Sequence, residues 1–302
     1  MKNNVLVIGG TCYCTVVHLN ELPEPKTQHL WSNSSYTTFG QMGTGKSLNL
    51  KKLGFETTLQ AYIGDDDYGR KIIEFFDKEN IILDYDFDPA GTETHINLMD
   101  KHGSRISITT NSRSFEPKIN YEKFEKLIIN NDFIALNIYN YCRHLIPVIK
   151  KHNKEIWCDL GDYEPENNYF DDFAIGADYI TMSSTHLKDY KLVMNKFIEM
   201  GKKLVVCTHG ANGATALTPN GIFIDTPIID EYKLIDANGA GDSFFSALLY
   251  SYSNGYSIEI SMKIATIVAG LCITSKELCH PDLSIELVKS EYTKFYGNTL
   301  GI

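Results

Sequence analysis

The feature that most constrains the fold is a regular alternation of short buried strands and amphipathic helices in the second half of the chain. After Pro117, four short apolar segments are typical of strands, and two helical patterns lie between them. The predicted strands cover 133–138, 155–159, 179–182 and 204–208, and the predicted helices cover 144–151 and 187–200. Alternation of this kind predicts an α/β protein with a mostly parallel sheet covered by helices.

The remaining segments extend this pattern at both ends. Residues 4–9 predict a buried first strand that stops at a Gly-Gly pair. Further elements are expected at 44–53 (helix), 57–63 (strand), 67–78 (helix), 214–224 (antiparallel strands), 240–252, 258–274 and 284–295 (helices). Two polar segments with short alternating stretches, 11–39 and 84–110, predict small antiparallel strands outside the main sheet.

Composition limits the partners and the compartment. Twenty-eight basic against 38 acidic residues give a net charge of -10, which argues against nucleic acid and anionic membrane as partners. No apolar run reaches the roughly 18–20 residues of a membrane span, and the first run is too short for a signal peptide, so a cytoplasmic location is expected. The seven cysteines fit a reducing compartment. Cys12 and Cys14 lack a second pair at ligand spacing, and the histidines show no cluster, so no zinc site is predicted.

The first of two phosphate-binding patterns is Gly-Gln-Met-Gly-Thr-Gly-Lys-Ser at 40–47, which matches Walker A spacing. In that motif backbone N–H groups surround the phosphates, the lysine reaches them and the hydroxyl holds magnesium. The expected helix follows, but the preceding residues 31–38 are polar and indicate an exposed strand where a buried one is needed. A P-loop NTPase using Lys46 and Ser47 is one alternative.

The second pattern is Asp-Ala-Asn-Gly-Ala-Gly-Asp-Ser at 236–243, at the start of the helix predicted over 240–252. Glycines at a helix N-terminus leave unpaired N–H groups in the positive field of the helix dipole, which favours an anion there. Asp242 falls in the first turn, where a carboxylate can accept the proton of an incoming hydroxyl. The simpler interpretation is a tight turn followed by an N-terminal helix charge.

Four motifs, in the same order, resemble those of the ribokinase-like (PfkB-type) carbohydrate kinases. Residues 238–242, with Asp236 before them, are similar to the family's C-terminal signature. The other three similar segments are 5–9, Leu53-Gly54 with 64–69, and 208–213. The resemblance implies a three-layer α/β/α ribokinase-like fold over 1–302 as a single domain, with a mostly parallel central sheet and a small β-strand lid formed by about 11–39 and 84–110.

The resemblance also implies an activity and its participants. The protein is expected to use ATP with Mg2+ to phosphorylate a hydroxyl of a small polar acceptor, most simply a sugar, a sugar derivative or a nucleoside-like molecule. Such lids often pair in a homodimer. The implied roles are general base for Asp242; anion hole for Gly239, Ala240 and Gly241; and nucleotide contact for Thr208, Gly210, Gly213 and Asn238. No metal ligand is assigned, and Asp236 is expected near the magnesium without binding it directly.

The acceptor side departs from the family pattern. The implied acceptor residues are Cys14, Gly40, Gln41 and Gly45. Gln41 replaces a glycine and Gly45 an asparagine of the family's Gly-Gly-x-Gly-x-Asn run, while Cys14 stands where an aspartate grips two hydroxyls. The family's Asn-x-x-Glu run is replaced by Ser-Ser-Thr-His at 183–186.

These departures leave two questions open. A catalytically weak or inactive sugar- or nucleotide-binding protein of the same fold is the second alternative. Lys46 is expected near the acceptor or on a solvated helix face, and an anionic acceptor such as a sugar phosphate would give Lys46 or Arg113 a purpose.

Overall fold

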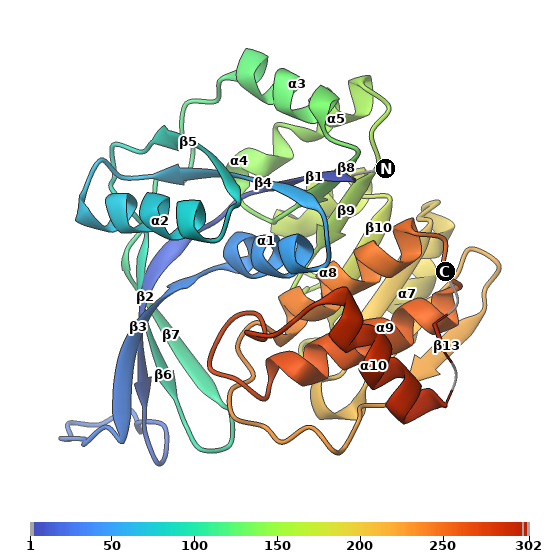
Figure 1. The fold of residues 1–302 in the computed structure, drawn as a ribbon. Coiled ribbons are helices and arrows are strands. Elements are labelled where there is room, and N and C mark those ends of the chain that lie inside the picture. The colour runs from blue at the N-terminus through green and yellow to red at the C-terminus, as the bar shows by residue number, and fades with distance from the viewer. Residues whose placement is uncertain (1–2, 298, 301–302) are drawn as a thin grey trace.

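A nine-stranded sheet forms the centre of the computed structural model, which describes residues 3–297 and 299–300 (Figure 1). Its order is β13 (Phe223–Thr226), β12 (Ala214–Leu217), β11 (Leu204–Thr208), β10 (Tyr179–Ser183), β9 (Ile156–Asp159), β8 (Phe133–Leu136), β1 (Asn4–Ile8), β4 (Glu56–Ile63) and β5 (Ile82–Phe87). The strands from β11 to β5 pair in parallel, whereas β12 and β13 pair antiparallel. The carboxyl ends of the parallel strands therefore meet at one edge, where α/β proteins place their sites.

Helices cover both faces of this sheet. One face carries α1 (Met42–Lys52), α2 (Asp67–Lys78), α8 (Ala240–Ser253), α9 (Ile258–Cys272) and α10 (Ile285–Tyr296). The other carries α3 (Tyr121–Asn130), α4 (Asn140–Arg143), α5 (Ile146–Lys151), α6 (Asp171–Gly176) and α7 (Tyr190–Glu199). Along β1, Val5 and Val7 belong to the first core while Leu6 and Ile8 belong to the second. A strand with apolar residues on both sides needs a helix layer over each face of its sheet. The predicted three-layer fold is therefore confirmed.

A second, four-stranded sheet stands beside the first. Its order is β3 (Ser34–Gly40), β2 (Cys12–His18), β6 (Thr94–Met99) and β7 (Arg105–Asn111). In Figure 1 it projects below β4 and α2, and β2 enters it directly after β1. We call this sheet the lid, as a name for the four strands.

Three local features differ from the sequence expectations. The β2–β6 pair is parallel, although only antiparallel strands were expected outside the main sheet. Residues 82–87, which overlap the expected lid segment 84–110, form the edge strand β5 of the large sheet because they pair in register with β4. The helix expected over 187–200 begins at Tyr190, because the Asp189 side chain accepts a hydrogen bond from Leu192 N at 3.0 Å and caps it there.

Membrane-spanning helices were not expected. Among the residues that the structure describes, no helix combines the length and apolar character that a bilayer span requires.

Gly43 allows the N-terminal half of α1 to pack against the end of β1. A Cβ at Gly43 would overlap the backbone carbonyl oxygens of Gly9 and Gly10, which have no room to move. Gly43→Ala should therefore lower the free energy of unfolding by about 1–3 kcal/mol, the usual cost of overpacking, despite alanine's better helix propensity. Urea denaturation checks this, with the exposed helical substitution Lys196→Ala as the control; equal midpoints for the two variants would contradict the packing argument.

Candidate active site

A buried lysine joins two carboxylates at the carboxyl edge of the large sheet. Lys46 of α1 is 0% exposed, and its Nζ lies 2.8 Å from Asp242 Oδ1 and 3.0 Å from Asp159 Oδ2. Asp159 ends β9, and Asp242 lies in the first turn of α8. Phe245, one turn further along α8, places its ring 5.0 Å from the same Nζ. The lysine therefore holds the carboxylates from β9 and α8 beside α1.

The charges in this cluster shift one another's pKa values. Burial raises the pKa of Asp242 to about 6, against the opposing attraction of Lys46. Burial alone would lower the pKa of Lys46, but its two carboxylate partners outweigh that effect and raise the pKa of Lys46 above its usual value. Lys46 is therefore a permanent cation, and Asp242 changes protonation state just below neutral pH.

The N-terminus of α8 presents free backbone donors next to Asp242. Gly239 caps this helix with a left-handed backbone, φ 83°, which glycine adopts without strain. The Ala240 N–H turns back to the Ala237 carbonyl at 3.3 Å, whereas the N–H groups of Gly239 and Gly241 have no hydrogen-bond partner within the described residues. A Cβ built on Gly241 would have no neighbouring atom within 4 Å, so the space beside it is open. An anion can thus approach the start of this helix.

The loop before α8 is held by the buried carboxylate of Asp236. Its Oδ1 accepts a hydrogen bond from Asn238 N at 2.8 Å, and its Oδ2 lies 3.5 Å from the Tyr36 hydroxyl of the lid. From the other end of the lid, Arg105 Nη1 donates to Asn238 Oδ1 at 3.0 Å. Both lid edges therefore contact the loop that carries the α8 N-terminus.

The residues expected to contact nucleotide follow β11 at the same sheet edge. Thr208 is the last residue of this strand, and Gly210 and Gly213 belong to the short turn after it. Gly210 has free space around a built Cβ, whereas Gly213 packs against the β13 carbonyl of Thr226. A cavity of about 520 Å³ adjoins this turn, and its lining includes His209, Asn212 and Thr215.

The residues expected to contact the acceptor lie together where the lid meets α1. Gln41 is the N-cap of α1, and Gly45 follows one turn later, where a Cβ would lie 2.5 Å from Asp242 Oδ2. Gly40 ends β3 opposite Cys12, and a Cβ there would overlap the Cys14 sulfur. The start of α1 therefore connects the cysteine face of the lid to Asp242 within about 6 Å of helix rise.

A buried glutamate that the sequence did not single out connects the residues around Gln41. Glu93 carboxylate oxygens lie 2.7 Å from Arg113 Nη1 and 2.7 Å from His95 Nε2, and one of them accepts a hydrogen bond from the Gln41 amide. The Arg113 guanidinium in turn stacks on the Tyr139 ring, 3.2 Å from its centroid. The Tyr139 hydroxyl is buried with no hydrogen-bond partner within the described residues.

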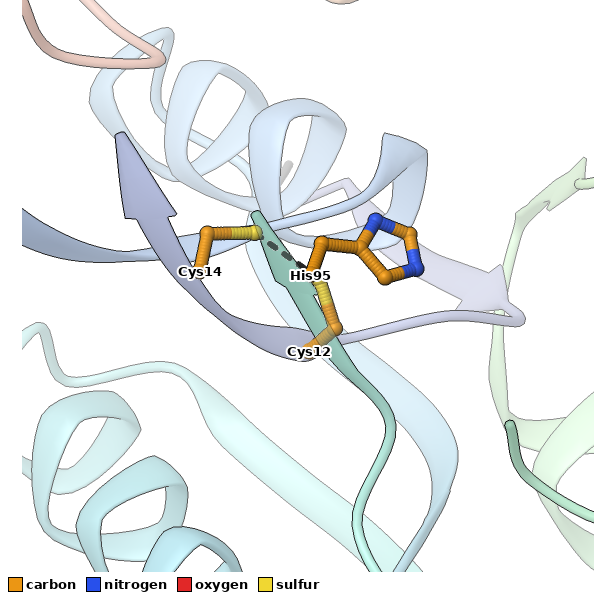
Figure 2. Close-up of side chains that lie close together, drawn as sticks. All are labelled: Cys12, Cys14 and His95. Atoms are coloured by element: carbon orange, nitrogen blue, oxygen red, sulfur yellow. Dashed lines mark hydrogen bonds between the residues drawn. The ribbon is translucent and has the colours of Figure 1, made fainter. Parts of the chain in front are cut away.

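Cys12, Cys14 and His95 gather on the same face of the lid, as Figure 2 shows. The two sulfurs are 3.2 Å apart. The hydrogen bond between them raises the pKa of Cys12 and lowers the pKa of Cys14, with the His95 charge adding to the second effect. Cysteine spacing alone did not reveal His95, because it comes from another strand.

The Walker A interpretation of 40–47 is wrong. A P-loop lysine must reach phosphate, but Lys46 is enclosed and neutralised by Asp159 and Asp242. The strand before the loop is β3 of the lid, whereas a P-loop needs a strand of the parallel sheet. Lys46 does not lie on a solvated helix face, because its side chain is 0% exposed, and its expected place near the acceptor stays a prediction.

Several site residues escaped the sequence analysis. Asp159 has a weak signal, as the one charged residue at the end of a buried strand, whose carboxyl end lies at the site edge of the sheet. Glu93 and His95 have none, because their proximity to Gln41 and Cys14 comes from the pairing of β2 with β6.

Comparisons with known proteins agree with this fold. The sequence pattern of the pfkB family carbohydrate kinases matches residues 178–285. The acarbose 7(IV)-phosphotransferase of Actinoplanes sp. is 26% identical over 279 residues, which cover 90% of this chain and 92% of that protein. The structure of a microbiome-derived acarbose kinase superposes with a TM-score of 0.87 at 24% identity, over 96% of this chain and 99% of the other. Arabidopsis thaliana ribokinase, solved with ribose and ATP, gives a TM-score of 0.81 at 20% identity over 98% and 100%.

The fold and the sequence matches define a carbohydrate kinase, an enzyme that transfers phosphate from ATP to an alcohol group of a sugar. The segment that matches the pfkB family of carbohydrate kinases, residues 178–285, contains both the turn after β11 and the start of α8. Neither the P-loop alternative nor the inactive binding protein is favoured by these relationships.

Proposed function

We propose that Asp242 is the general base of this kinase and that the Gly239 and Gly241 N–H groups form its anion hole. The observation that carries the proposal is the position of the Asp242 carboxylate beside unpaired N–H groups at an open helix N-terminus. Ala240, expected in the anion hole from the sequence, contributes through the turn it forms with Ala237.

The proposed reaction uses these groups in one step. Asp242 accepts the proton of the acceptor hydroxyl while the hydroxyl oxygen attacks the γ-phosphorus. The bond between the γ-phosphorus and the oxygen that bridges it to the β-phosphate breaks, and ADP is released. The helix N–H groups stabilise the charge on the transferred phosphoryl group. Lys46 keeps Asp242 oriented and ionised through the 2.8 Å ion pair. Arg105 of the lid, bound to Asn238, adds positive charge near the same loop.

The nucleotide is proposed to lie along the turn after β11, with Thr208, Gly210 and Gly213 beside its phosphates and ribose and Asn238 at the other side. Two features support this placement of the nucleotide: Gly210 leaves open space, and the α8 N-terminus offers unpaired N–H donors for phosphate oxygens. Mg2+ supplies charge neutralisation on the triphosphate. Ser183 replaces the family asparagine, and Asp236 Oδ1 accepts a hydrogen bond from Asn238 N, so we assign no side chain as a direct ligand of Mg2+.

The acceptor is proposed to be an uncharged carbohydrate that contacts Gln41, Glu93 and Tyr139. Two cations near this pocket, Lys46 and Arg113, are already paired with carboxylates, Lys46 with Asp159 and Asp242 and Arg113 with Glu93. Arg105 is bound to the neutral amide of Asn238 and keeps its charge. Because Lys46 and Arg113 are neutralised by carboxylates, an uncharged acceptor fits this arrangement better than the anionic acceptor considered from the sequence. Acarbose is the first compound to test because two similar proteins carry that name.

Glu93→Gln should raise the KM for the acceptor by about ten- to a hundredfold with a smaller effect on kcat. The change removes the charge that holds Arg113, His95 and Gln41, and hydrogen bonds to charged groups contribute about 1.5–3 kcal/mol. Initial rates over a range of acceptor concentrations separate KM from kcat. Exposed Glu122→Gln serves as the control, and an unchanged KM for Glu93→Gln would remove this pocket from acceptor binding.

The proposed activity is tested by acceptor-dependent ADP release with Mg-ATP. The panel comprises acarbose, ribose, other neutral sugars, sugar phosphates and nucleosides. Release with a neutral sugar supports the assignment, and release only with sugar phosphates contradicts the proposed acceptor class. ADP formation without any acceptor would contradict the transfer reaction.

Two further features complete the proposal. A second copy is proposed to pack on the lid, whose outer strand β7 is exposed along its length and carries Ile106 and Ile108 outward. Sedimentation of the full chain tests this homodimer. We also propose a cytoplasmic location, where ATP is available and the seven free cysteines remain reduced.

A further inference from the structure

We propose that Cys12, Cys14 and His95 form a binding site for a thiophilic divalent cation, with Zn2+ as the physiological candidate. One ligand atom from each residue lies within 4.8 Å of the other two (Figure 2). Two thiolates and one imidazole are ligands that zinc prefers.

Strand geometry explains why these three side chains meet. Cys12 and Cys14 are two residues apart on β2, so both point to the same face of the lid. His95 is the register partner of Cys14 on the neighbouring strand β6 and therefore lies on that face as well. Gly40 lies across from Cys12 on β3 and leaves room for the two sulfurs. A Cβ at this position would overlap the Cys14 sulfur.

The surroundings of His95 are those of a metal ligand. The Glu93 carboxylate, which can only accept, lies 2.7 Å from Nε2, so Nε2 carries the proton and Nδ1 carries the lone pair. A carboxylate that orients a ligating histidine is a recurring element of zinc sites. Glu93 is itself fixed by Arg113 and Gln41, which keeps the imidazole in place.

Metal binding requires only a small rearrangement. The sulfurs are 3.2 Å apart, and two Zn–S bonds of about 2.3 Å at a tetrahedral angle place them about 3.8 Å apart. The cation replaces one proton on each thiol, and both protons pass to water, so the binding is a ligand exchange without oxidation.

Three protein ligands leave one coordination position open. The site borders the pocket assigned to the acceptor, because its ligand His95 contacts both Glu93 and Gln41. The inference that zinc competes with the sugar rests on the proposed function, whereas the existence of the metal site does not. Excess zinc would then inhibit the kinase by excluding its acceptor.

The test is titration of the reduced full chain with Co2+, kept reduced by a phosphine, followed by displacement with Zn2+. We expect one equivalent to bind with sulfur-to-cobalt charge-transfer absorption and the visible bands of a tetrahedral site. Cys14→Ser and His95→Ala should weaken binding at least tenfold, and Glu93→Gln should weaken it about ten- to a hundredfold. Cys207→Ser, a buried cysteine of β11, is the matched control and should bind like the wild type.

Two results would overturn the metal site. One is the absence of charge-transfer absorption in the wild type, and the other is equal affinity in Cys14→Ser and wild type, with urea denaturation showing that both are folded. A separate competition experiment adds the acceptor found in the ADP assay. Stoichiometric binding that the acceptor does not displace would refute the inhibition but leave the site. Because the spectrum is read without turnover, failure of the kinase assignment would not alter the titration.

Discussion

Asp242→Asn should lower kcat by about a hundredfold to ten-thousandfold while ATP still binds. The amide keeps the shape of the side chain but cannot accept the hydroxyl proton, and general base catalysis typically contributes that factor. The coupled ADP assay measures kcat, and calorimetric titration measures nucleotide affinity. Asp172→Asn, an exposed carboxylate paired with Arg143, is the control. A near-wild-type kcat for Asp242→Asn would reject Asp242 as the base.

The same residue sets the acid side of the pH profile. Burial raises the pKa of Asp242 to about 6, so the carboxylate becomes protonated, and inactive as a base, as the pH falls through that value. The wild-type kcat should therefore decrease below about pH 6 and level off above it. Asp242→Asn should lose this dependence.

Lys46→Met should have the second largest effect, on both stability and pH dependence. It removes the cation from between two carboxylates without leaving a large cavity. Breaking a buried ion pair by removing one partner costs about 3–5 kcal/mol, because the remaining charges stay buried. Without Lys46, burial and the like negative charge of Asp159 both raise the pKa of Asp242, so the acid limb of kcat should move to higher pH.

Urea denaturation and pH–rate profiles check this prediction. Lys51→Met on the same helix is the control, since its partly exposed ion pair contributes about 1 kcal/mol or less. The double variant Lys46→Met with Asp159→Asn should recover part of the lost stability, because only one carboxylate then remains unpaired. Equal denaturation midpoints for Lys46→Met and Lys51→Met would contradict the buried-pair argument. An unshifted acid limb would contradict the coupling of Lys46 to Asp242.

The two faces of the site differed in how far the sequence could predict them. The proposed anion hole and Asp242 lie within five consecutive residues, 238–242, whose geometry follows from a local rule about glycines at a helix N-terminus. The proposed acceptor pocket combines α1, β2, β6 and Arg113, which are up to about a hundred residues apart. No spacing along the chain encodes such a combination. Because Gln41, Gly45 and Cys14 depart from the family's acceptor motif, that motif could not identify the pocket either.

Lys46 shows most clearly how local sequence can fail to predict a residue's partners. Its local context, Gly-Thr-Gly-Lys-Ser, is that of a phosphate loop, and a helix follows it as in a P-loop. Its actual partners are 113 and 196 residues further along the chain, and they became visible only when β9 and α8 were placed against α1.

The sequence by itself determined the layered α/β architecture, the order of its elements and the glycine-rich start of α8, because burial patterns and glycine-rich turns act over a few neighbouring residues. Only the tertiary structure decided that Lys46 pairs with Asp159 and Asp242, that Glu93 joins Arg113, His95 and Gln41, and that Cys12, Cys14 and His95 share one face. Strand pairing and helix packing bring those groups together, and the energies of their charges depend on burial and distances that exist only in the folded chain.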